Sequence, residues 1–149
     1  MNVFVGLCCA LASLHLQTAE TFPIVSRLSG DDLARREISV DLIARPATEE
    51  VSVFAGRVVE AEGLVSWDDK PMMEMTAENG LSFAGVTAGN GRNVSVVYLT
   101  DRPDSLLVCR IRARTTAFDH ARYRAARWCA GQLGVELPEQ PSPPIIVDS

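Results

Sequence analysis

Residues 93–133 decide the fold, and they read NVSVVYLTDRPDSLLVCRIRARTTAFDHARYRAARWCAGQL. Two segments rich in β-branched or alternating apolar side chains, 93–99 and 106–112, are joined by a polar turn at 100–105, which predicts an antiparallel hairpin. Apolar side chains then recur at helical spacing over 117–133, and Gly134 ends this pattern. The segment therefore predicts two paired strands followed by a helix that covers one of their faces.

The same segment holds two cysteines that we expect to form a disulfide. Cys109 shares a strand face with Leu107 and Ile111, and this apolar face is the one that the helix should cover. Cys129 lies on the apolar stripe of the helix, beside Trp128. A bridge between the two cysteines closes a loop of about 20 residues. In a reducing cytosol the same residues would instead be free thiols in the core.

Upstream of this segment the chain alternates helix and strand patterns. After an irregular lead-in at 20–29, helices are predicted at 31–36 and 48–62, and strands at 38–42, 72–76 and 81–88. Asn90-Gly91 predicts a tight hairpin turn whose two central residues both have positive φ. The predicted fold is α+β: a small antiparallel sheet of three to five strands, with the C-terminal helix and the 48–62 helix packed on one face.

The ends of the chain differ in character from this central domain. Residues 1–19 carry no charged side chain, and their apolar run at 3–14 is followed by the small Ala19 ahead of the polar Glu20. This pattern favours a signal peptide over 1–19, a single domain over 20–137 and a Pro-rich disordered tail over 138–149. A buried N-terminal strand or helix of a cytosolic protein is the alternative for 1–19.

A cleaved leader has consequences for location. The apolar run is shorter than the roughly 20 residues that span a bilayer, so we expect no permanent membrane span in the mature chain. Cleavage also leaves two cysteines, an even number that favours a disulfide in an oxidising compartment. The predicted location is periplasmic or secreted, with the cytoplasm as alternative. Lys70 is the only lysine among 14 basic residues, and this arginine bias suggests a GC-rich bacterial gene.

The distribution of charge singles out one arginine-rich segment. The formal net charge of −5 argues against nucleic-acid binding, which needs a broad basic surface. Segment 110–127 nevertheless carries six arginines against one acid, Asp119. Three alternate along the predicted strand, on the face opposite the core, and three follow on the helix: Arg110, Arg112, Arg114, Arg122, Arg124 and Arg127. Arginine forks suit a small anionic ligand or an acidic protein partner. The alternative is a solvated surface paired with the chain's own acids.

Three functions remain open at this point. The first is an exported, non-catalytic binding or interaction protein that uses the arginine strip. The second is an enzyme acting on an anionic substrate through His120 and nearby arginines. The third is a cytosolic regulatory or adaptor domain. We expect no cofactor and no metal site, because two thiols and His120 do not complete a tetrahedral set of ligands.

Overall fold

The structure, a computed structural model, describes residues 20–66 and 73–139, with the backbone alone at 65–66 and 73–76. The predicted signal peptide and residues 140–149 of the predicted tail lie outside the described residues. In chain order the elements are β1 (Ile24–Leu28), α1 (Asp31–Arg35), β2 (Ser39–Ala44), α2 (Val51–Glu60), β3 (Val65–Ser66), β4 (Met73–Thr76), β5 (Ser82–Gly89), β6 (Asn93–Thr100), β7 (Leu107–Arg114) and α3 (Thr115–Gln132).

All strand pairs are antiparallel, which confirms the predicted α+β class. The strand order is β1-β2-β7-β6-β5-β3, and β4 also pairs with β5. The sheet has seven strands, more than the three to five expected from the sequence. One additional strand is β1, where the sequence indicated an irregular lead-in. A register shift between Ile24 and Ser26 interrupts the alternation along β1, and this hides the strand pattern in the sequence.

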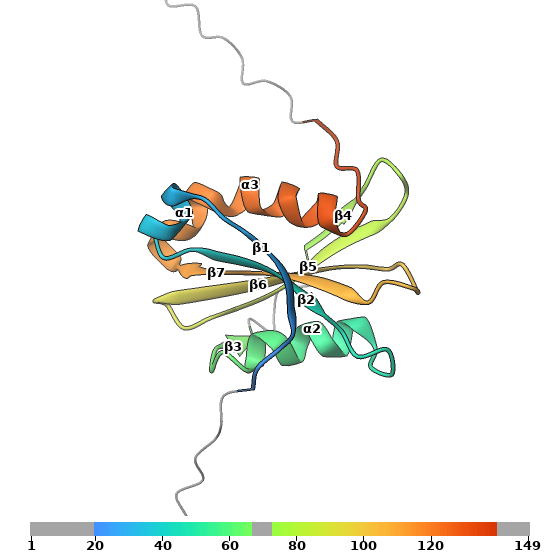
Figure 1. Ribbon diagram of the computed structural model, residues 1–149, viewed down its shortest axis with the longest axis horizontal. Helices are drawn as coiled ribbons and strands as arrows, with labels where there is room; N and C mark the ends of the chain where they lie inside the picture. Colours follow the sequence, from blue (N-terminus) through green and yellow to red (C-terminus); the bar gives the residue numbers. More distant parts are fainter. Residues whose placement is uncertain (1–19, 67–72, 140–149) are drawn as a thin grey trace, which may run out of the picture.

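The sheet is covered on both faces, and each face has its own core (Figure 1). α3 packs on one face, against residues such as Cys109 and Ile111 of β7. α2 packs on the other, where its Val58 and Val59 share a core with Val97 of β6. The prediction that both helices share one face was therefore wrong. The central strands carry apolar side chains on both faces, so each face needs a helix to cover it.

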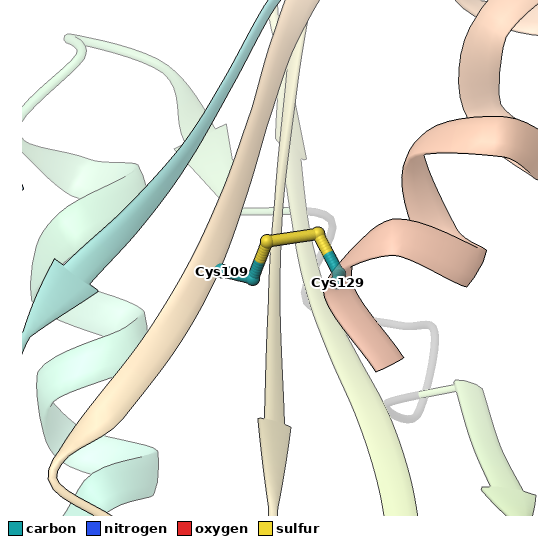
Figure 2. The surroundings of a disulfide bond; sticks show 2 residues. All are labelled: Cys109 and Cys129. Atoms are coloured by element: carbon teal, nitrogen blue, oxygen red, sulfur yellow. A yellow bond between two sulfur atoms is a disulfide. The ribbon is translucent and has the colours of Figure 1, made fainter. Parts of the chain in front are cut away.

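The predicted disulfide is present and joins β7 to α3 (Figure 2). Cys109 and Cys129 are both fully buried, and their Cα atoms are 5.5 Å apart. The bond lies in the core on the α3 face, so it ties the last helix to the middle of the sheet. None of the helices within 20–66 and 73–139 is long and apolar enough to cross a bilayer.

The β5–β6 hairpin turn is present but shifted by one residue from the prediction. The backbone N–H of Asn90 donates to the carbonyl of Asn93 at 3.1 Å, so the central residues are Gly91 and Arg92. Only Gly91 of these two has positive φ, at 83°. The Asn90 side-chain oxygen accepts hydrogen bonds from the backbone N–H groups of Arg92 and Asn93, at 3.0 and 2.8 Å. This contact fixes the asparagine at the first position of the turn, ahead of its two central residues.

Removing the disulfide should destabilise the domain. The bridge spans 20 residues of chain, and the loss of this constraint on the unfolded state costs about 3 kcal/mol. We expect the double variant Cys109→Ala/Cys129→Ala to lose this free energy of unfolding, measured by urea titration. A reducing agent should destabilise the wild type and leave the double variant unchanged. Equal stability of the two oxidised proteins would contradict this role.

Candidate functional site

A polar cleft opens on the α2 face of the sheet, where three strands place small side chains around an arginine. Arg112 of β7 pairs in register with Ser39 of β2 on one side and with Ser95 of β6 on the other. Serine fills little space, and a cleft of about 490 Å³ lies over this row. Most residues that line it are polar: Glu37, Ser39, Glu62, Asn90, Asn93, Ser95, Arg112 and Arg114. Apolar surface comes from Leu64, Val94 and Ala113.

The next row of the sheet, deeper under α2, carries a buried charge network. Asp41 of β2 pairs in register with Arg110 of β7, and its carboxylate has no exposure to solvent. Its Oδ1 accepts a hydrogen bond from Arg27 Nε at 2.6 Å, and its Oδ2 accepts from Arg110 and Arg112 at 3.1 and 3.3 Å. Glu62, just beyond α2, accepts from Arg110 at 2.9 Å and from Arg112 at 3.4 Å.

The ionisation of Asp41 follows from this network. Burial alone would raise the pKa of Asp41, because a buried carboxylate loses its hydration. Hydrogen bonds from Arg27 and Arg110 outweigh burial and hold the pKa below its usual range. Asp41 is therefore a fixed anion at neutral pH, and it anchors the guanidinium of Arg112 at the floor of the cleft.

Several donors at this site have no protein partner. Ser95 Oγ, Arg110 Nε and Arg112 Nε are buried and have no hydrogen-bond partner among the described residues. Ser95 has no exposed surface, yet it lines the cleft together with Arg112. A buried polar atom without a partner is costly, so such atoms usually meet a ligand or an ordered water. Nε–H can only donate, and the missing partner must therefore be an acceptor such as a carboxylate or phosphate oxygen.

The predicted arginine strip divides into two groups on opposite sides of the sheet. Arg110, Arg112 and Arg114 share one face, as the alternation along β7 required. On that face Arg110 is buried, whereas Arg112 and Arg114 line the cleft. The prediction placed these arginines on an outer face of the sheet, but α2 packs on that face, and all three arginines pair with acids of the chain itself, Asp41, Glu62 and Glu37.

The second group lies on α3, and its members have their own partners. Arg122 is near Asp119 at 3.7 Å, and Arg124 pairs with Asp32 at 2.9 Å. Arg127 donates to the Tyr123 hydroxyl and to the carbonyl of Pro138. These three arginines do not line the cleft. The structure thus brings together Arg110, Arg112 and Arg114, and it keeps the helix arginines apart from them.

The residues of the enzymatic hypothesis do not meet at this site. His120 is exposed on α3 and does not line the cleft around Arg112. No group of three or more His, Cys, Asp or Glu side chains within 20–66 and 73–139 could hold a metal ion.

Sequence reasoning missed most of the polar residues around Arg112. Asp41 lies within a predicted strand. A charged residue at such a position indicates an ion pair across the sheet, but only when the residue opposite it on the neighbouring strand is known. Ser39 and Ser95 carry no such signal, because serine is ordinary in strands. Asn90 was recognised only as a turn residue, although it also borders the cleft.

Comparisons of this chain with known proteins give no match. No protein-family model matches it, and neither a curated protein nor a solved structure shows significant similarity to it. The argument for a function therefore rests on the geometry of the cleft.

Asp41→Asn should destabilise the protein in a pH-dependent way. Loss of the charge leaves buried Arg110 without one of its two anionic partners and should cost about 3 kcal/mol at neutral pH. The folded pKa of Asp41 lies below the unfolded value of about 3.9, so its stabilisation is complete above that pH and is lost as pH falls through the folded pKa.

Urea unfolding of wild type and Asp41→Asn across pH tests this expectation. The stability gap between them should narrow at acidic pH. Asp119→Asn is the matched control, because its carboxylate is exposed and its loss should change little. A gap that stays constant down to the lowest accessible pH would show that Asp41 is not the charged anchor.

Proposed function

We propose that this chain is an exported, non-catalytic binding protein that holds a small anionic ligand in the cleft around Arg112. The observation that carries the proposal is that Ser95 and Arg112, two residues lining one cleft, each have a buried polar atom, Ser95 Oγ and Arg112 Nε, without a hydrogen-bond partner among the described residues. Each of these atoms can donate to an acceptor oxygen, and a charged acceptor gains most from an arginine donor.

The charges of the cleft and of the network beside it also support a ligand with one negative charge. Four guanidinium groups, those of Arg27, Arg110, Arg112 and Arg114, either line the cleft or belong to the network around Asp41. They face three carboxylates, those of Asp41, Glu62 and Glu37. The guanidinium of Arg112 is already oriented by Asp41 and Glu62, so a ligand would not have to order this side chain on binding.

The size of the cleft favours a small molecule over a protein partner. Its volume of about 490 Å³ falls in the usual range of small-ligand sites, roughly 300–1,000 Å³. The arginines that an acidic protein would meet first, on the exposed side of α3, are occupied by Asp119, Asp32 and Tyr123. The cleft is thus the better candidate for an anion.

Export is supported by two features of the chain. The uncharged apolar leader fits a signal peptide, and a buried disulfide is typical of proteins in oxidising compartments. N-terminal sequencing of the protein from its native host tests this part of the proposal. We expect the mature chain to begin at Glu20, and an intact Met1 would favour the cytosolic alternative.

Anion binding is tested by calorimetric titration with acetate, succinate, phosphate and sulfate. We expect at least one of these anions to bind the wild type. Arg112→Gln should weaken that binding at least about tenfold, because it removes a charge-assisted donor. Arg122→Gln is the matched control, since it removes an exposed arginine on the other face of the sheet. Equal loss in both variants would point to a nonspecific charge effect and contradict the site.

The hydroxyl of Ser95 provides a second test that does not alter charge. Ser95→Ala should leave the stability equal or slightly higher, because an unpartnered buried hydroxyl contributes nothing to the fold. It should weaken anion binding about tenfold. Thr100→Val is its control, since Thr100 Oγ1 is also buried and without a partner among the described residues but lies away from the cleft. Unchanged binding by Ser95→Ala would contradict the proposed contact.

A further inference from the structure

We propose that the ligand of this cleft is a small zwitterion that carries a carboxylate and an ammonium group, and that Glu37 receives the ammonium. This inference rests on the proposed function, because it assigns the anionic half of the ligand to Arg112 and Ser95. It adds a cationic half and a residue that selects it. Free α-amino acids and short peptides are the two ligand classes with this chemistry.

The first observation is the backbone conformation of Glu37. Its φ is +56°, and among the described residues it is the only non-glycine residue with positive φ. Glu37 follows α1 at the position where a helix commonly ends in a left-handed residue. The N–H of Glu37 donates to the carbonyl of Ala34 at 3.1 Å, and the N–H of Ile38 donates to that of Leu33 at 2.9 Å. This pair of bonds defines a Schellman motif, in which glycine is the favoured residue.

A glutamate at such a position is unfavourable for the fold. A side chain in the left-handed region brings its Cβ too close to the backbone, and glycine avoids this contact. The only partner that the structure gives the carboxylate is Arg114, at 2.5 Å, and both side chains are more than half exposed. An exposed ion pair of this kind adds little stability. The glutamate is therefore better explained by what it contacts in the cleft than by what it does for the helix.

The second observation is the arrangement of charge around the cleft. Glu37 and Glu62 line it together with Arg112 and Arg114, so acidic and basic groups are both present. An anion with several negative charges would meet two carboxylates there, and like charges at close range repel. A ligand with one carboxylate and one ammonium matches both signs. The side chains of Asn90 and Asn93, which also line the cleft, can donate to or accept from an amide of such a ligand.

Titration calorimetry with paired probes tests the inference. Glycine, leucine, glutamine and diglycine each have an N-acetylated form that keeps the carboxylate and loses the ammonium charge. We expect at least one free form to bind wild type at least about tenfold more tightly than its acetylated partner. The preference for diglycine or for the single amino acids then distinguishes the two ligand classes.

Variants of Glu37 separate a binding role from a structural one. Glu37→Gln should bring the two members of each pair to within about threefold of each other. Glu37→Gly should do the same and also raise the midpoint of thermal unfolding by about 3 °C, because glycine suits the left-handed position. Glu136→Gln, an exposed substitution outside the cleft, is the control and should keep the wild-type selectivity.

Three results would overturn the inference in distinguishable ways. Acetylated probes that bind as tightly as free ones, in an Arg112-dependent manner, would reject the zwitterion and leave the anion site standing. Selectivity that persists in Glu37→Gln and Glu37→Gly would reject the role of Glu37. Absence of binding by every probe and by every simple anion would reject the proposed function together with the inference.

Discussion

A carboxylate without access to water, that of Asp41, organises the polar half of this fold. A buried charge is tolerated only when oppositely charged groups surround it, and Arg27, Arg110 and Arg112 supply them. Two of these arginines come from β7 and the third from β1, so the network ties the edge strand, β2 and β7 together. Asp41 and Glu62 hold the terminal nitrogens of Arg112, whereas its buried Nε has no partner among the described residues.

The cleft exists because the two faces of the sheet are covered unequally. α3 has 18 residues and is bonded to β7 through the disulfide, whereas α2 has only 10. Gly63, with φ of +67°, turns the chain away after α2 and sends it to pair with β5. The row of Ser39, Arg112 and Ser95 lies where this shorter cover ends. The apolar cores and the disulfide stabilise the fold, while the polar corner around the cleft is the part that we propose binds a ligand.

Local patterns in the sequence predicted most of the helices and strands. The packing between elements that lie far apart in the sequence was the part predicted incorrectly. The strands of β5, β6 and β7 and the final helix follow from alternation and helical spacing, and the disulfide follows from placing Cys109 and Cys129 on facing surfaces. The sequence could not show that α2 crosses to the opposite face, because its apolar stripe fits either one. The alternation along β7 placed Arg110 and Arg112 on the face opposite Cys109, as the structure has them, but their environment depended on which face α2 covers.

The candidate site was only half predictable for the same reason. Arg112 and Arg114 stood out as members of a charged run. The role of Asp41 depends on its cross-strand pairing with Arg110, which lies 69 residues away in sequence. Glu37 stands out because of its positive φ, a backbone angle that the sequence pattern does not reveal. A site whose residues come from three strands and a helix end is therefore recognised from the three-dimensional fold and not from the sequence.

Nitrogen-15 NMR of arginine side chains tests the central claim most directly, because each Nε–H group gives its own resonance. Titration with glycine and with acetate should shift the Nε–H signal of Arg112 in a saturable manner and leave those of Arg122 and Arg124 in place. A saturable shift confined to the helix arginines, or an Arg112 signal that does not respond to either compound, would contradict a ligand site at this corner of the sheet.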